Sequence, residues 1–307
     1  MDASWSETTA VGAWLRLLRV PNLFTVPGDS LAGFLLACAA GASGDVRSAV
    51  LAAGASLCLY MVGLITNDWF DLATDRRERP HRPLAAGRIW IPAALTVAGI
   101  LAVLGVVLGL LAGHWAGLLA VTLLLFLLSY NAGGKRVPVW GPLNMGVCRG
   151  LSLMMGAAAA GASGPVAGTV VVSAIGLTLY VAGITFIAAG ETKTGPVSLV
   201  RWAPPVVLVL WFGVLYLTST TVSPTTQVVS MVLAFFAVVW AVYCAQSLAG
   251  TPEPVRVSRT IGSYLRGLLL VQAALVTMVL HPGGFVGVVL LLFFPISTRL
   301  ARRFYAS

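Results

Sequence analysis

Apolar residues run along this chain in stretches of about twenty, separated by short polar segments. A helix needs about twenty predominantly apolar residues to cross a bilayer. The pattern therefore predicts an all-α polytopic transmembrane helical bundle of nine to ten spans, forming one domain over residues 1–307. Hydropathy places ten spans near residues 15–40, 46–67, 89–112, 115–130, 143–162, 166–189, 202–219, 226–248, 261–280 and 284–300. The alternative is nine spans, if one of the late segments is re-entrant and does not cross the membrane completely.

Composition strengthens this assignment. Of the 307 residues, 58% are hydrophobic and only 9% are charged, whereas soluble chains contain about 25% charged residues. These values exclude a soluble globular domain, a disordered chain and a secreted disulfide scaffold. The four cysteines lie inside apolar spans without metal-ligand spacing, so we expect them to be small buried hydrophobic residues.

The charge balance indicates the orientation. The chain has 19 basic and 10 acidic residues, a net charge of +9. In membrane proteins such an excess accumulates in cytoplasmic loops, so we expect no nucleic-acid partner. A cytoplasmic amino terminus also puts the loops near 68–88, 131–142, 190–201 and 249–260 inside, and leaves only Arg47 of the basic residues outside. We therefore predict a multi-pass protein of the cell membrane with its active-site loops in the cytoplasm.

One acidic segment at the end of the second span is the strongest sign of chemistry. It contains Asn67, Asp68, Asp71 and Asp75. On a continuous helix, positions 67, 71 and 75 stack along one face, because each step of four residues turns by about 40° and rises about 6 Å. Crowded hard oxygen ligands of this kind suit Mg²⁺, which leaves coordination positions open for phosphate oxygens. The alternative is a solvated helix end whose acids pair with neighbouring arginines, Arg76, Arg77 and Arg79.

A second set of polar residues is expected on the same side of the membrane: Tyr130, Asn131, Lys135, Arg136, Asn144, Arg149, Glu191 and Lys193. Lysine and arginine neutralise a phosphate whose charge is partly bridged by metal ions. Lys135 and Arg136 can equally be ordinary cytoplasmic anchors. Arg149 can contact phosphate or form a structural pair with Asp29 or Glu191.

Taken together, carboxylates and cations face one another across the cytoplasmic mouth of a bundle with an apolar interior. We therefore expect a central cavity open to the cytoplasmic side. This combination suits a pyrophosphate head bound through Mg²⁺ and a long hydrocarbon tail. The three histidines show no metal-ligand spacing, and Gly-rich phosphate loops are absent from the sequence.

The acidic segment resembles the first aspartate-rich motif of the UbiA superfamily of intramembrane prenyltransferases. The similarity lies in Asn67-Asp68-x-x-Asp71-x-x-x-Asp75, and it continues through Glu78-Arg79-Pro80 to Arg82-Pro83. The region from Tyr130 to Arg149 is similar to that family's fourth-to-fifth-span region. In motif detail the chain looks most like the EboC-like branch.

This resemblance implies a helical bundle, usually of nine spans, around a lateral cavity. It implies that two aspartate-rich motifs hold Mg²⁺ on an isoprenyl diphosphate, whose ionisation yields an allylic cation that an acceptor captures. Applied to this chain, the resemblance implies that Asn67, Asp71 and Asp75 are catalytic residues that hold Mg²⁺. Asp68 and Glu191 complete the expected metal ligands. The expected diphosphate-binding residues are Tyr130, Lys135, Arg136, Asn144, Arg149 and Lys193.

The second motif departs from the family pattern. Two or three aspartates are typical there, whereas Glu191-Thr192-Lys193-Thr194-Gly195 contains a single carboxylate. Glu191 either completes the metal site from the opposite side or is a surface anion paired with Lys193 or Arg201. We favour the first interpretation, because acids at membrane boundaries are scarce and usually functional.

The sequence thus predicts Mg²⁺-dependent transfer of a prenyl group from an isoprenyl diphosphate to a small acceptor in the membrane. The acceptor is expected to be aromatic or lipid-soluble, and membrane lipid is the surrounding partner. Two alternatives remain open. One is an intramembrane terpene cyclase, and the other is a non-catalytic protein that binds or transports a prenyl diphosphate.

Overall fold

The computed structural model describes residues 9–161, 168–189, 199–218, 224–279 and 283–304, and their regular structure is helical. The helices are α2 (Ala10–Leu17), α3 (Val20–Leu23), α4 (Pro27–Ala39), α5 (Val46–Phe70), α6 (Leu72–Glu78), α7 (Ile91–Ala112), α8 (His114–Asn131), η1 (Gly134–Arg136), α9 (Trp140–Ala159), α10 (Gly168–Ala188), η2 (Leu199–Trp202), α11 (Ala203–Thr218), α12 (Pro224–Ser247), α13 (Pro254–Val276) and α14 (Gly283–Phe304). The all-α expectation is confirmed.

Several helices begin where the local sequence favours a start. Asp45 is the N-cap of α5, and its carboxylate accepts a hydrogen bond of 2.8 Å from the backbone N–H of Ser48. That hydrogen bond lowers the pKa of Asp45. Helices α4, α7 and α13 each have a proline at the first or second position. A missing N–H costs nothing there, because the first turn has no intrahelical acceptor for it.

The first span is where the expected boundaries are wrong. A continuous segment over 15–40 was predicted, but the chain forms α2, then the single turn α3, and only then α4. Arg19, between α2 and α3, has a φ of 44°, in the left-handed region. Pro21 and Pro27 explain the interruption, because proline removes a backbone donor and disfavours helical geometry at the residue before it.

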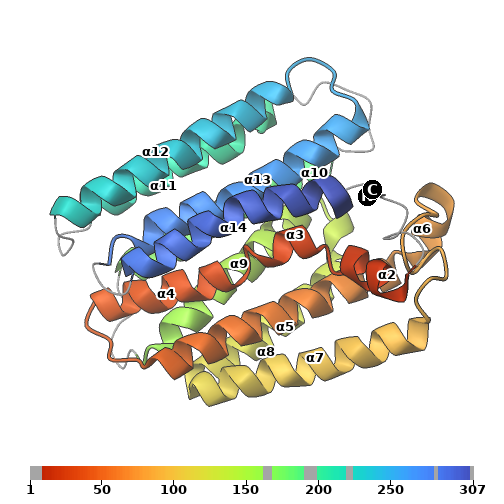
Figure 1. Cartoon of the computed structure of the whole chain (residues 1–307), viewed down its shortest axis with the longest axis horizontal. Coiled ribbons are helices and arrows are strands. Elements are labelled where there is room, and N and C mark those ends of the chain that lie inside the picture. The colour runs from red at the N-terminus through yellow and green to blue at the C-terminus, as the bar shows by residue number, and fades with distance from the viewer. Residues whose placement is uncertain (1–8, 162–167, 190–198, 219–223, 280–282, 305–307) are drawn as a thin grey trace.

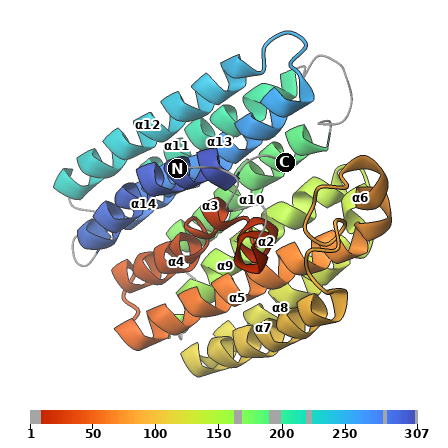
Figure 2. The same ribbon diagram turned by 45° about the vertical axis from the view of Figure 1, so that its right-hand side comes forward.

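The long helices lie roughly side by side, with α7 at one edge of the bundle and α12 at the other (Figures 1 and 2). Helix α9 is central and contacts α4, α8 and α10, while α5 packs on α7. On the other side α13 contacts α12, α14 and α4. One apolar core joins these elements, and a smaller cluster holds α2 against α5 and α7 through Ala13, Leu17, Ile65, Ile89 and Ala98.

Glycines allow the central helices α4 and α9 to approach closely. A Cβ added at Gly33 would collide with the backbone carbonyl of Leu153, and one added at Gly156 would collide with that of Ser30. Small residues permit such packing between membrane helices. The contact positions the polar residues of α9 beside the interrupted first span.

Eight helices of the described chain are long and apolar enough to span a membrane, counting α3 with α4 and η2 with α11. Helices α9 and α13 are as long, at 20 and 23 residues, but they carry buried polar side chains that lower their hydropathy. Both run within the bundle (Figure 1). The chain is thus a multi-pass membrane protein, and the count of nine to ten spans stays a prediction.

Candidate active site

A cavity of about 540 Å³ opens where α5 ends, and α5, α8, α9, α10 and α13 line it together with the interrupted first span. Its mouth holds the acids of the segment 67–71 and several cations. Its interior is largely apolar, with side chains that include Tyr60, Leu64, Leu123, Leu127, Met145, Val181, Ile184, Ile261 and Leu265. The expected central cavity is therefore present, with its acids, Lys135 and Arg82 at one end.

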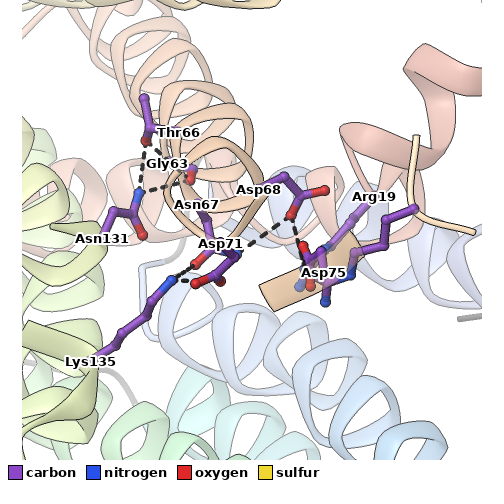
Figure 3. Close-up of polar contacts among 10 residues, drawn as sticks. Arg19, Gly63, Thr66, Asn67, Asp68, Asp71, Asp75, Asn131 and Lys135 are labelled. Atoms are coloured by element: carbon purple, nitrogen blue, oxygen red, sulfur yellow. Dashed lines mark hydrogen bonds and ion pairs between the residues drawn. The ribbon is translucent and has the colours of Figure 1, made fainter. Parts of the chain in front are cut away.

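Lys135 connects the basic loop to the acidic segment. Its Nζ donates to Asn67 Oδ1 at 3.1 Å and pairs with Asp71 Oδ2 at 2.6 Å (Figure 3). Lys135 lies on the short helix η1, which follows α8. Next to it, Asn131 donates to Thr66 Oγ1 at 2.7 Å and to the Gly63 carbonyl at 3.0 Å. These bonds tie the end of α8 to α5, which holds Lys135 opposite the acids.

The other two acids, Asp68 and Asp75, lie around Arg82, and Asn67 Nδ2 connects the two groups at 3.5 Å from Asp68 Oδ1. Arg82 Nη1 lies 2.8 Å from Asp75 Oδ2 and 3.5 Å from Asp68 Oδ1, and Arg19 Nη2 lies 3.8 Å from the same Asp68 oxygen. Asp75 is only 3% exposed. Burial raises the pKa of Asp75 above its usual value, although the charge and hydrogen bond of Arg82 act in the opposite direction.

The predicted stack of Asn67, Asp71 and Asp75 is therefore broken, because Asn67 and Asp71 share Lys135 whereas Asp75 joins Asp68 at Arg82. Helix α5 ends at Phe70 and α6 starts at Leu72, so these positions do not share one unbroken helix. Within the described residues no three Asp, Glu, His or Cys side chains gather closely enough to form a metal site. The acids also do not pair with Arg76, Arg77 or Arg79 in the ion pairs described above; their partners are Lys135, Arg82 and Arg19.

The oxygen atoms nevertheless suit Mg²⁺ as its protein ligands. Asn67 Oδ1 and Asp71 Oδ2 already converge on one cationic centre, the Lys135 ammonium. Asp68 Oδ1 and Asp75 Oδ2 converge on one guanidinium nitrogen of Arg82. Mg²⁺ takes one or two carboxylates and completes its shell with phosphate oxygens and water. Each oxygen pair matches that requirement.

Arg149 forms an ion pair with Asp29 and also lines the cavity, so its contact with the diphosphate stays a prediction. Its Nε lies 2.7 Å from Asp29 Oδ2, and its Nη2 donates to the Thr25 carbonyl at 2.8 Å. Gln272 Nε2 donates to the same carbonyl and to Asp29 Oδ1, each at 2.6 Å. Thr25 lies in the interruption of the first span, so these donors satisfy backbone that the missing helix leaves unpaired.

The remaining predicted residues are placed as follows. Tyr130 lines the cavity, as does Arg149. Arg136 is exposed and Asn144 is fully buried, and neither is among the cavity-lining residues. The exposure of Arg136 follows from the turn of η1, which directs Lys135 into the cavity and Arg136 away from it. Glu191 and Lys193 lie outside the described residues.

Several polar residues that line this cavity were not among the predicted site residues. They are the arginines Arg16, Arg19, Arg79 and Arg82, together with His81, Asn22, Ser56 and Ser152. Asn22 is 2% exposed, and its Oδ1 has no hydrogen-bond partner in the described structure. The motif Glu-Arg-Pro-x-Arg-Pro was a signal for Arg82, and the signal for Asn22 was its position as a polar residue in the inner part of the first span.

Residues 30–265 match the UbiA prenyltransferase family, and since this is more than half of the chain, the protein belongs to that family. One curated relative is the digeranylgeranylglyceryl phosphate synthase of Methanococcoides burtonii, 28% identical over 157 residues. That match covers 49% of this chain and 56% of the relative. The chain thus spans about half the length of the curated relatives it matches.

Two solved structures share the fold. A structure of a digeranylgeranylglyceryl phosphate synthase superposes with a TM-score of 0.60 at 23% identity, covering 87% of this chain and 97% of the other. A UbiA homologue from Archaeoglobus fulgidus bound to GPP and Mg²⁺ gives 0.59 at 14% identity, covering 94% and 99%. The relatives are synthases and not EboC-like proteins, so the assignment stands at the level of the UbiA family.

Proposed function

We propose that this protein transfers an isoprenyl group from its diphosphate to a lipid-soluble acceptor within the membrane, with Mg²⁺ as cofactor. The observation that carries the proposal is the distribution of polarity in one cavity: acids and cations at its mouth, and an apolar chamber behind them. A charged diphosphate head joined to a hydrocarbon tail has the same distribution.

The mouth residues bind the diphosphate head. Lys135 supplies a cation at 2.6 Å from Asp71, and Arg82 and Arg19 supply cations beside Asp68. Asn67, Asp68 and Asp71, which line the cavity, would hold Mg²⁺, which supplies charge neutralisation to the leaving pyrophosphate when bound, and Asp75, behind Arg82, stays a predicted ligand. Preorganised cations at the position where charge develops favour ionisation of the carbon–oxygen bond. Glu191, Lys193 and Tyr130 stay predicted contributors to this site.

The apolar chamber receives the isoprenyl tail. Its lining includes Ser56 of α5 and Ser152 of α9, whose hydroxyl oxygens lie 2.8 Å apart. Ser56 is fifteen positions before Asp71, which corresponds to about 22 Å along a helix. The chamber therefore extends far enough from the acids to hold a long tail and to exclude water from the allylic cation.

Asn22 marks the position of the acceptor. Its unpaired Oδ1 can accept a hydrogen bond from an acceptor hydroxyl, because a buried amide oxygen without a partner is costly. The named product of the curated relatives is a glyceryl phosphate lipid. We therefore favour a lipid alcohol as acceptor over the aromatic ring expected from the sequence.

Pyrophosphate release tests this function. Purified full-length protein with geranylgeranyl diphosphate, Mg²⁺ and geranylgeranylglyceryl phosphate should release pyrophosphate and form a prenylated lipid. Lys135→Met should weaken diphosphate binding about ten- to a hundredfold, because a hydrogen bond to a charged group contributes about 1.5–3 kcal/mol. Arg136→Met is the matched control: it removes the same charge one residue away, outside the cavity, and should have little effect.

Asp71→Asn should lower turnover strongly, whereas Asp45→Asn, at the opposite end of α5, should not. Equal activity of the parent and Asp71→Asn would refute the proposal. A prenyl-derived hydrocarbon or alcohol formed without acceptor would instead indicate a cyclase. Tight Mg²⁺-dependent diphosphate binding without turnover would indicate a binding or transport protein.

A further inference from the structure

A second cavity, of about 390 Å³, lies between the end of α12 and the start of α13. Its lining includes two arginines, Arg256 and Arg259, and hydroxyl groups of Ser247, Thr260 and Ser263. It is separate from the active-site cavity, which α13 lines with a different set of residues, Ser258, Ile261 and Leu265. One helix thus presents polar groups to two cavities.

The arginines of the second cavity have no acidic partner among the described residues. Glu253 lines the same cavity but forms no ion pair with either of them there, and the cavity carries a net charge of +1 from these three groups. Ser247 and Thr260 are held by a hydrogen bond of 3.1 Å between their hydroxyls. Guanidinium groups are well suited to phosphate, which they bind with parallel hydrogen bonds.

An apolar track leads away from this cavity along the outer face of α12. Its residues are Val232, Phe236, Val239 and Tyr243, which are 49%, 53%, 46% and 64% exposed and follow helical spacing. Tyr243 also lines the cavity. Helix α12 is at the edge of the bundle (Figures 1 and 2), so this face meets lipid in a membrane.

We propose that the second cavity binds the phosphate head group of an anionic phospholipid, whose acyl chain lies along the track on α12. Arg256 and Arg259 pair with the phosphate. The hydroxyl groups of Ser247 and Thr260 donate to backbone carbonyls of their own helices, so their oxygens, together with the Glu253 carboxylate, can accept hydrogen bonds from the hydroxyls of a glycerol head group. Because the two arginines lie at one end of the lipid-exposed apolar track, this surface is complementary to a lipid that has an anionic head group and an apolar chain.

Lipid binding to the purified full-length protein tests the site, with phosphatidylglycerol and phosphatidylcholine as probes and native mass spectrometry as the measurement. Phosphatidylglycerol should bind more tightly. The double variant R256Q/R259Q should weaken its binding about thirtyfold, since each arginine near a membrane surface contributes about one kcal/mol toward anionic lipid. The matched control R299Q/R302Q removes two arginines near the end of α14, outside this cavity, and should keep parental binding.

The proposal would be overturned if R256Q/R259Q and R299Q/R302Q lost the same affinity for phosphatidylglycerol. Equal binding of phosphatidylglycerol and phosphatidylcholine to the parent would also overturn it. So would soluble glycerol phosphate binding as tightly as phosphatidylglycerol, because the track would then contribute nothing. Photocrosslinking of the parent protein with a head-group diazirine lipid is independent of any variant's folding. It should label the segment 243–263, and labelling confined to other segments would contradict the assignment.

Discussion

At the scale of single residues, the geometry of the site depends on which basic side chain pairs with which carboxylate. Asp75 is followed directly by Arg76 and Arg77, yet its partner is Arg82, at 2.8 Å. Asp71 pairs with Lys135, 64 positions along the chain. Local spacing identified the acids and the basic loop, but the partners depend on how α6, the loop after it and η1 fold over the end of α5.

The Asp75–Arg82 pair should make stability depend on pH. The raised pKa of Asp75 means that folding favours its protonated form, so its contribution to stability falls as pH rises through the folded-state pKa. Arg82→Gln removes the charge that opposes this shift. The variant should lose about 1–3 kcal/mol at pH 8 and clearly less at pH 5, because an ionised buried acid is left unpaired.

Thermal unfolding in detergent at both pH values measures this difference. Adding Asp75→Asn to the Arg82→Gln variant should restore much of the loss at pH 8. A loss of the same size at both pH values would show that Arg82 acts through packing alone.

Substitution of Asn22 should weaken binding of the acceptor and leave binding of the diphosphate unchanged. Asn22→Leu keeps a similar volume at a residue that lines the cavity but removes its buried, unpaired amide oxygen. The KM for geranylgeranylglyceryl phosphate should rise about tenfold, the value of one hydrogen bond, while the KM for geranylgeranyl diphosphate stays the same. Met145→Leu, a conservative change in the same cavity, should alter neither. Parallel rises in both KM values for Asn22→Leu would contradict this role.

At the scale of helices, the interruption of the first span and the close contact of α4 with α9 build the interior of the site. The interruption exposes the Thr25 carbonyl, which receives donors from Arg149 and Gln272. This arrangement follows the rule that irregular backbone at membrane depth occurs where protein or a cavity can satisfy it. Two prolines were visible in the sequence, but the partners of the freed backbone come from α9 and α13.

Gly156→Ala should destabilise the protein by about 1–3 kcal/mol, because the new methyl group would overlap the Ser30 backbone and force α4 and α9 apart. Gly99→Ala in α7 is the matched control. No atom lies within 4 Å of a Cβ added there, so stability should stay equal or increase slightly. Thermal unfolding in one detergent compares the two. A Gly156→Ala variant as stable as Gly99→Ala would show that the two helices can separate without cost.

At the scale of the whole molecule, polarity is arranged along the bundle. The acids of the active site, Lys135 and the arginines of the second cavity lie near helix ends at residues 70, 131 and 254. Arg47, at the start of α5, belongs to the opposite end. An excess of lysine and arginine on one side predicts that this side faces the cytoplasm.

Cysteine labelling in intact cells tests this orientation. Arg47→Cys and Arg77→Cys replace exposed residues at opposite ends, in a background without the four native cysteines. A membrane-impermeant maleimide should label position 47 in intact cells and position 77 only after permeabilisation. The reverse pattern would overturn the predicted topology.

The sequence by itself determined the membrane class, the approximate positions of the spans and the acidic and basic segments of the site. It could do so because both features are local in the sequence. The length of an apolar run decides whether a helix can cross a bilayer, and the positions of lysine and arginine decide which loops stay in the cytoplasm. Tertiary structure decided the rest. It divided Asn67, Asp68, Asp71 and Asp75 into two pairs, left Arg136 outside the cavity and brought Asn22 into it. These outcomes depend on helix ends and on the rotation of each helix in the bundle, and packing between segments far apart in the chain sets both.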